Sequence, residues 1–341
     1  MYIILKERSK MDNVMLMGLI GQIVVYIVVF IFGACIGSFL NVCIYRLPAG
    51  ESLTKRNSHC MTCGAEIKRY DLIPIISWLF VLKGKCRSCG QKISGRYPLV
   101  ESLNAILFVL VFLKYDFFGT GIMMPVLMCL FISTVIVIGF EDYDTQEMTL
   151  AVLLIMAAIS AAAAVLALPQ VNVIRGGMCS MKDSIIGAFA VSVPFLLIGF
   201  VLTPLFMSAK DENRSSARKI RKRLKEMNSL TNKDTREIRK LETELEKLEA
   251  EIKEQGPVFG FGMGDVILMA AAGIMLGWQK VLVAAGVGIL VGAVYGVIRK
   301  RRSEDSQFAF GPWLAIGIGF AIFLGDPVVQ WYANLLTVPA V

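Results

Sequence analysis

Long runs without a charged residue are the feature that most limits how this chain can fold. No Asp, Glu, Lys or Arg occurs within 13–45 or within 117–140. About 20 consecutive apolar residues are enough for a helix that spans a bilayer. Only 18% of the 341 residues are charged, against about 25% in a typical soluble domain. The sequence therefore predicts a polytopic membrane protein and excludes a soluble enzyme, a secreted disulfide scaffold and a nucleic-acid-binding domain.

Hydropathy predicts an all-α fold with about eight membrane-spanning helices. The expected spans are 16–40, 98–115, 119–140, 149–168, 184–207, 263–279, 281–298 and 308–334. Three hydrophilic stretches, 46–97, 208–258 and 299–307, contain 10, 14 and 4 of the 35 Lys and Arg residues. Because cytoplasmic loops carry an excess of positive charge, we expect all three stretches on the cytoplasmic side, where they face anionic membrane lipid.

The stretch 208–258 is predicted to form an antiparallel helical hairpin. Apolar residues recur in it at the three- and four-residue spacing of a helix, and Thr231–Asp234 resembles a capping box that opens the second helix. The two arms have opposite net charges, +6 over 210–225 and −3 over 226–254, which favours their pairing. Two interpretations stay open: a solvated coiled-coil insertion, or a docking site for a partner protein or for acidic lipid.

Four cysteines form two Cys-x-x-Cys pairs: Cys60, Cys63, Cys86 and Cys89. Two such pairs supply the four thiolates of a tetrahedral zinc site. Gly64 and Gly90 follow the second cysteine of each pair, where a tight turn needs an open backbone conformation. In a reducing cytoplasm metal binding is favoured over a disulfide, while a redox dithiol pair and a metal-free loop remain alternatives. A closed four-thiolate site leaves no position for substrate, so this zinc is expected to be structural.

The chain contains a single histidine, His59, and this excludes several kinds of hydrolytic site. A Ser-His-Asp triad and an HExxH zinc protease each need a histidine where this chain has none. Any hydrolytic chemistry must therefore use carboxylates, thiols, lysines or a metal site without histidine.

Two acidic segments lie at the expected membrane boundary. Glu141–Asp144 closes the third span, and Gly262–Asp265 opens the sixth, so both lie at the same cytoplasmic boundary of the predicted topology. Carboxylates at membrane depth are costly. Two carboxylates close together share a proton, which suits aspartic proteolysis: one activates water and the other donates to the peptide carbonyl. In the alternative interpretation, these acids merely close helix ends at the lipid boundary.

A series of ordered motifs resembles the type IV prepilin peptidase family, membrane aspartic proteases of the Gly-x-Gly-Asp type. The matching segments are Gly33–Val42, Arg46–Pro48, Ser58–Cys60, both cysteine pairs, Ile73–Ser77, Arg96–Glu101, Asp142–Thr145, Gly262–Asp265 and Phe310–Pro312. The resemblance covers nearly the whole chain.

This resemblance implies that Asp142 and Asp265 are the catalytic pair, with Gly262, Gly264 and Asp144 as supporting residues of the two motifs. It implies a protein of the bacterial inner membrane with its active site facing the cytoplasm. The substrates would be prepilins and pseudopilins, cut after a glycine between their basic leader and their hydrophobic stem. It also implies methylation of the new N-terminal amine with S-adenosylmethionine, at a site near 46–97.

Four features depart from the family pattern. Met148 and Thr149 stand where an aliphatic residue and a proline usually follow the first motif, and Glu141 replaces an apolar residue. Ile267 stands where a lysine often follows the second aspartate, and the hairpin before Gly262 is unusually long. Both aspartates are nevertheless present, so we expect an active enzyme.

The sequence predicts five segments. They are an N-terminal segment with the first span (1–45), the zinc-binding domain (46–97), spans that include the first aspartate (98–207), the hairpin (208–258) and the second motif with the last spans (259–341). Two other functions stay open: a transporter with a zinc-stapled loop, and a non-catalytic assembly factor that recruits pilus or secretion components through the hairpin.

Overall fold

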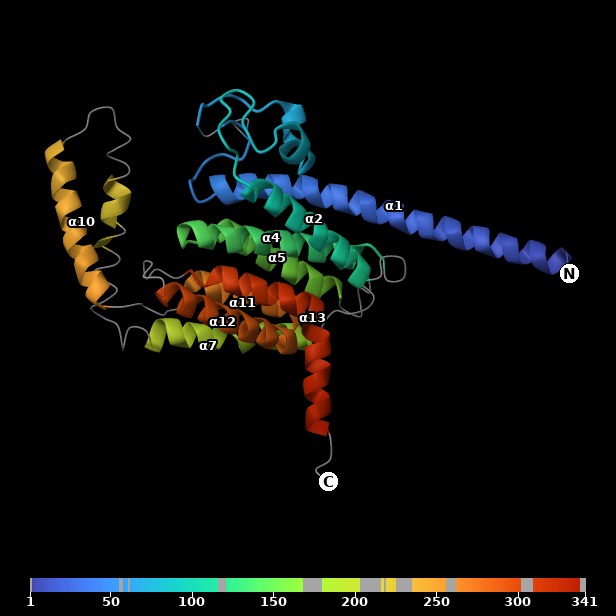
Figure 1. The fold of residues 1–341 in the computed structure, drawn as a ribbon. Coiled ribbons are helices and arrows are strands. Elements are labelled where there is room, and N and C mark those ends of the chain that lie inside the picture. Colours follow the sequence, from blue (N-terminus) through green and yellow to red (C-terminus); the bar gives the residue numbers. More distant parts are fainter. Residues whose placement is uncertain are drawn as a thin grey trace.

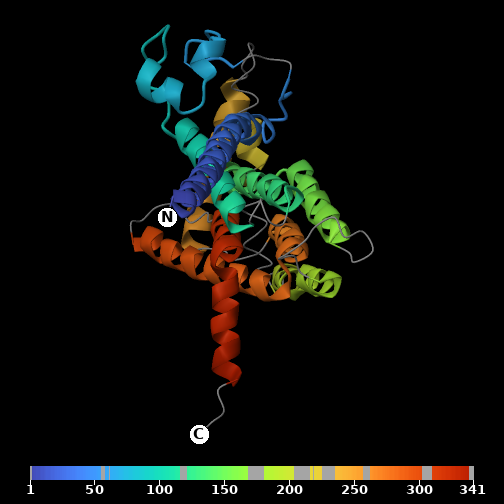
Figure 2. The same ribbon diagram turned by 90° about the vertical axis from the view of Figure 1, so that its right-hand side faces the viewer.

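A computed structural model describes the fold of most of the chain (Figures 1 and 2). The described residues are 2–54, 58–60, 62–115, 121–167, 180–202, 216–217, 219–224, 235–255, 262–301 and 309–337. Within these ranges the structure is helical, with irregular loops and two isolated β-bridges, and it has no strand. The all-α prediction is therefore confirmed.

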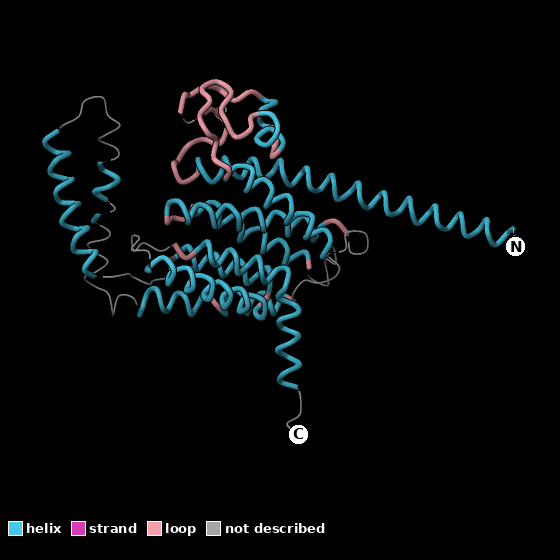
Figure 3. Tube along the Cα trace, viewed as in Figure 1, coloured by secondary structure: helices cyan, strands magenta, loops and turns pink. Residues whose placement is uncertain are grey.

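The apolar helices form one bundle, and the charged helix α10 lies outside it (Figure 1). The α-helices are α1 (Tyr2–Arg46), α2 (Arg96–Lys114), α4 (Met123–Thr145), α5 (Leu150–Leu166), α6 (Met181–Ala190), α7 (Ser192–Leu197), α10 (Thr235–Gln255), α11 (Met263–Leu276), α12 (Trp278–Arg301) and α13 (Gly311–Thr337). Three short helical turns are η1 (Arg69–Leu72), η2 (Ser77–Val81) and η3 (Ile198–Leu202). Figure 3 shows that the segment between α1 and α2 is mostly irregular.

Six helices are long and apolar enough to cross a membrane, so the chain is a multi-pass membrane protein. They are Gly18–Arg46, Arg96–Lys114, Met123–Thr145, Met181–Phe200, Trp278–Ile298 and Gly311–Leu336. The other two predicted spans correspond to α5 and α11, which have 17 and 14 residues. At 1.5 Å per residue, 14 residues cover about 21 Å of a hydrocarbon core of about 30 Å. The prediction of eight spans is therefore not confirmed.

A glycine ends α11 earlier than hydropathy predicts. Gly277 has a φ of 81°, in the left-handed region that side chains disfavour, and α12 begins at the next residue.

Close helix crossings also depend on glycine. A Cβ atom on Gly187 of α6 or Gly273 of α11 would overlap the backbone of the other helix. Small residues of this kind let helices approach closely where lipid supplies no hydrophobic driving force.

Helix α4 lies at the centre of the bundle, and two thirds of its most apolar stretch is buried. A polar network joins it to α1 and α2. The Asn104 side chain, which is fully buried, donates from Nδ2 to the carbonyl oxygen of Gly33 at 2.7 Å. Ser133 of α4 donates to Asn104 Oδ1 at 3.1 Å. Because these groups satisfy one another, they can remain buried inside the bundle.

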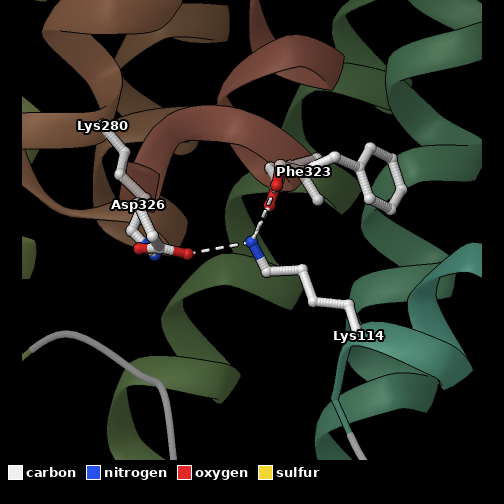
Figure 4. A network of polar contacts seen from close by, with 5 residues as sticks. Lys114, Lys280, Phe323 and Asp326 are labelled. Carbon is white, nitrogen blue, oxygen red and sulfur yellow. Dashed lines mark hydrogen bonds and ion pairs between the residues drawn. The ribbon is translucent and has the colours of Figure 1, made fainter. Parts of the chain in front are cut away.

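Helix α13 contains Pro327 and changes direction along its length (Figure 1), and charged side chains gather beside Phe323 and Asp326 (Figure 4). Proline has no N–H, so the carbonyl of Phe323, four residues earlier, lacks its helical donor. Lys114 Nζ donates to that oxygen at 3.3 Å and to the preceding carbonyl oxygen at 2.5 Å. Lys114 and Lys280 also form ion pairs with Asp326, at 2.8 and 2.7 Å. The cluster ties α2, α12 and α13 together where α13 turns away from the bundle (Figure 1).

The described part of the predicted hairpin contains two ion pairs between its arms. Arg221 contacts Glu249 at 2.7 Å, and Arg223 contacts Glu237 at 2.9 Å. Exposed pairs of this kind contribute about 0–1 kcal/mol each. The expected capping box at Thr231–Asp234 lies outside the described residues.

Candidate functional site

The two predicted catalytic aspartates come from different helices and lie close together. Asp142 belongs to the last turn of α4, and Asp265 to the first turn of α11. Each is 6% exposed. Met148 lies between them: its side chain lies against Gly264, which precedes Asp265, and against Gly311, whose N–H donates to Asp142. The fold therefore places two buried carboxylates at one end of the bundle.

A backbone N–H at the start of a helix orients each carboxylate. Gly311, the first residue of α13, donates its N–H to Asp142 Oδ2 at 2.7 Å. Gly262, which precedes α11, donates its N–H to Asp265 Oδ2 at 2.9 Å. A helix N-terminus favours negative charge. Asp265 Oδ1 is buried and has no hydrogen-bond partner in the described part of the chain, so this oxygen is available to a water molecule or a substrate.

Two glycines of the site lie against other side chains of the site. A Cβ atom on Gly264 would lie 2.8 Å from Met148 Sδ, and one on Gly311 would lie 2.7 Å from Asp142 Oδ2. At Gly262 the nearest atom to a Cβ would be 3.8 Å away. A side chain at 264 would therefore displace Met148, a contact that the motif alone does not reveal.

Asp144, the supporting residue of the first motif, does not join the pair of aspartates. Its Oδ2 forms an ion pair with Arg96 Nη1 at 2.6 Å. The Arg96 guanidinium also lies over the ring of Phe140, 4.9 Å from its centroid. Asp144 therefore connects the end of α4 to the start of α2.

Two of the departures from the family pattern contact each other. The Glu141 side chain is fully buried, and its Oε2 accepts a hydrogen bond from the backbone N–H of Thr149 at 3.1 Å. The third departure, Ile267, packs against the apolar core. Sequence reasoning assigned no role to Gly311, because nothing local to Phe310–Pro312 indicates that it contacts Asp142.

The four predicted metal ligands form one cluster in the loop between α1 and α2. All four sulfur atoms lie within 4.8 Å of one another, and Cys60 Sγ and Cys89 Sγ are 3.9 Å apart. Four sulfurs bound to zinc at ~2.3 Å are separated by about 3.8 Å. The residues therefore fit a tetrahedral metal ion.

The two cysteine turns have the same backbone structure. The Cys60 N–H donates to the carbonyl oxygen of Ala65 at 2.9 Å, and the Gly64 N–H donates to the carbonyl oxygen of Cys60 at 2.8 Å. In the same way, the Cys86 N–H donates to the carbonyl oxygen of Gln91 at 2.8 Å, and the Gly90 N–H donates to the carbonyl oxygen of Cys86 at 2.9 Å. Gly64 and Gly90 have φ of 69° and 71°, which confirms that these positions adopt the left-handed conformation.

Hydrogen bonds favour negative charge on two groups of this loop. The backbone N–H groups of Cys63 and Thr62 lower the pKa of Cys60 to about 6. Arg87 donates to both oxygens of Asp71, at 2.9 and 2.6 Å, and these bonds lower the pKa of Asp71. The first effect prepares a thiolate for metal binding, and the second ties the second cysteine turn to η1.

A cavity of about 430 Å³ lies between the four-cysteine loop and the adjoining ends of α1 and α2. Its lining includes Tyr45, Ser77, Trp78, Tyr97 and Glu101. Glu101 Oε2 accepts the backbone N–H of Ile75 at 2.7 Å. The Ser77 hydroxyl is buried and has no hydrogen-bond partner in the part of the chain that the structure describes. The cavity thus combines aromatic faces, a carboxylate and an unused hydroxyl.

A pair of buried aspartates at one end of a bundle of membrane-spanning helices is the arrangement of a membrane aspartic protease. Comparison with protein families agrees. Residues 31–115 match the bacterial peptidase A24 N-terminal domain, and residues 129–297 match the type IV leader peptidase family. The chain belongs to the type IV leader peptidase family. The first match contains the four cysteines, and the second contains both aspartates.

Curated relatives resemble the chain over most of its length. A prepilin leader peptidase/N-methyltransferase of Aeromonas salmonicida (strain A449) is 28% identical over 90% of this chain and 94% of its own length. A protein of the same name from Bacillus subtilis (strain 168) is 26% identical over 90% of this chain and 98% of its own length. One from Myxococcus xanthus is 34% identical over 50% of this chain and 47% of its own length. No solved structure gives a significant match.

Proposed function

We propose that this protein is a membrane aspartic endopeptidase that removes the basic leader from prepilins and pseudopilins. The observation that carries this proposal is the placement of Asp142 and Asp265, both buried, on either side of Met148 in a chain of the type IV leader peptidase family. The names of the curated relatives support the substrate class. The cut follows a glycine and separates a charged leader from an apolar stem.

The two carboxylates act as a unit that shares one proton. The ionised carboxylate removes a proton from water, and the resulting hydroxide attacks the scissile carbonyl carbon. The protonated carboxyl donates a hydrogen bond to the carbonyl oxygen and later transfers its proton to the leaving amine. The pair titrates together, so neither role belongs to one residue. The N–H groups of Gly311 and Gly262 each hold one carboxylate oxygen, which limits the rotation of both side chains.

The active site faces the cytoplasm of a bacterium and lies in its inner membrane. The stretch 46–97 carries ten Lys and Arg residues, which favours the cytoplasmic side. Arg96 joins the end of this stretch to Asp144, two residues after Asp142. The aspartates therefore lie near the boundary at which a basic leader stays in water and an apolar stem enters lipid.

A second activity, methylation of the new N-terminal amine, is supported by the cavity beside the four-cysteine loop. S-Adenosylmethionine supplies an electrophilic methyl group on a positively charged sulfur. The residues present suit such a ligand: Tyr45, Trp78 and Tyr97 offer aromatic faces for the adenine ring and the cation. Glu101 offers a carboxylate and Ser77 an unpaired hydroxyl. Zinc at the four cysteines would hold the loop that forms one wall of the cavity.

Purified protein in detergent is expected to convert a prepilin to its mature form, because both aspartates are present and oriented. Mass spectrometry of the product should locate the new N-terminus after the leader glycine. A mass gain of one methyl group is expected only when S-adenosylmethionine is added. An uncut prepilin with folded enzyme would contradict the peptidase function, and cleavage without the mass gain would contradict the methylation.

Ultraviolet cross-linking of radiolabelled S-adenosylmethionine tests the cavity independently of turnover. The label is expected on peptides that contain Tyr45, Trp78 or Tyr97, because these side chains line the cavity. Excess unlabelled methyl donor should remove this label. Labelling confined to α11, α12 or α13 would contradict the assignment of the cavity.

A further inference from the structure

Glu141 lies next to Asp142 in the chain, yet its carboxylate contacts the turn that follows α4. It is fully buried, and Oε2 accepts the N–H of Thr149 at 3.1 Å. Oε1 has no hydrogen-bond partner in the described part of the chain. Thr145 stabilises the same turn, since its hydroxyl oxygen lies 2.8 and 3.1 Å from the carbonyl oxygens of Glu141 and Glu147 and can donate to either.

This turn places Met148 between the segments of the two aspartates. Met148 immediately precedes Thr149, and the backbone N–H of Thr149 donates to Glu141. A Cβ on Gly264 would lie 2.8 Å from Met148 Sδ, and one on Gly311 would lie 2.5 Å from Met148 Cε. Gly264 precedes Asp265 in the chain, and Gly311 is the donor to Asp142. Met148 is therefore packed between the segments that carry and orient the two catalytic carboxylates.

We propose that Glu141 is a positioning residue of the peptidase site, which rests on the proposed peptidase function. Its carboxylate holds Thr149, and through this bond it holds Met148 between the two glycine segments. Glu141 does not exchange a proton with substrate. Its contribution is the spacing of the catalytic pair, and a small displacement of reacting groups can lower a rate by ~10²-fold.

The backbone of Thr149 permits a sharp test of this hydrogen bond. Its φ is −67° and its ψ is 118°, which are values that proline adopts without strain. Thr149→Pro therefore removes the N–H at a φ that proline can adopt, and it also removes the Thr149 hydroxyl, which interacts with Glu141 as well. Glu141→Leu removes the acceptor with a side chain of similar volume. Glu141→Leu leaves the Thr149 N–H without its acceptor, and Thr149→Pro leaves the Glu141 carboxylate without its donor, whereas the double variant removes both groups.

The measurement is kcat and KM for prepilin cleavage by wild type, Glu141→Gln, Glu141→Leu, Thr149→Pro and the double variant. Glu147→Leu is the matched control, since it makes the same change at an exposed position of the same turn. Glu141→Leu and Thr149→Pro are each expected to lose about 10-fold or more in kcat with little change in KM. The double variant should recover to within about 3-fold of wild type. Glu141→Gln keeps an acceptor for the N–H and should also remain within about 3-fold of wild type.

The outcomes separate this proposal from its rivals. A Glu141→Gln enzyme as inactive as one that lacks a catalytic aspartate would make Glu141 a third catalytic acid and overturn the proposal. Full activity of Glu141→Leu, or a double variant no better than its singles, would also overturn it. Inactive wild type would instead contradict the peptidase function on which the proposal rests.

Discussion

Asp142→Asn and Asp265→Asn are each expected to abolish leader cleavage while the protein stays folded in the membrane. Asparagine keeps the shape of aspartate and can still accept the N–H of Gly311 or Gly262. It cannot take a proton from water or return one to the leaving amine. General acid–base catalysis contributes ~10²–10⁴-fold, so the rate should fall by an amount in this range when the shared proton is lost. Mass spectrometry of a purified prepilin measures the effect.

Asp144→Asn is the matched control for the two catalytic variants. Asp144 contacts Arg96 rather than the catalytic pair, and its side chain is one third exposed. The same chemical change at this position is therefore expected to lower the rate by less than about 10-fold, since exposed ion pairs contribute little energy. Normal processing by either catalytic variant would contradict the assignment of the pair. Normal unfolding temperatures would show that a loss of activity is not a loss of fold.

Replacing Cys60 and Cys86 with serine is expected to remove a zinc ion and to unfold the loop between α1 and α2. In the described part of this loop, short helical turns and two isolated β-bridges are the regular structure, so bonds to the metal would supply much of its stability. Elemental analysis of wild type should give about one zinc per chain. Limited proteolysis should then cut the variant between α1 and α2, where the wild type resists.

Cys35→Ser provides the control for the zinc experiment. Cys35 is an exposed cysteine of α1 and lies outside the four-cysteine cluster, so this variant should keep both its zinc and its resistance to protease. Freshly purified wild type without metal would contradict the zinc assignment. A chelator that removes the metal and leaves the loop resistant to protease would contradict its structural role.

Several properties of this protein depend on local sequence patterns, and these could be predicted. Membrane insertion follows from runs of apolar residues, because each residue contributes to the transfer into lipid regardless of its later neighbours. The metal cluster follows from two-residue spacing, which brings each pair of cysteines to one turn. The Gly-x-Gly-Asp and Asp-Tyr-Asp motifs predicted which two aspartates form the catalytic pair. Each of these signals lies within a few consecutive residues.

Other properties depend on contacts between segments far apart in the chain. The N–H of Gly311 orients Asp142. Lys114 donates a hydrogen bond to the carbonyl oxygen of Phe323, which Pro327 leaves without a backbone donor. The helix α11 is also shorter than hydropathy predicts, because it ends at Gly277, which has a φ of 81°. Hydropathy averages over a window and does not register a single backbone angle.

The hydrogen bond between Glu141 and Thr149 also depends on tertiary structure and could not be predicted from the sequence. The sequence marked both residues as unusual, but it could not indicate that one compensates for the other. That relation requires the carboxylate to turn away from its neighbour Asp142 and toward the next helix. Apolar runs and metal-ligand spacing are properties of the chain, whereas the orientation of a buried side chain results from the packing of several helices around it.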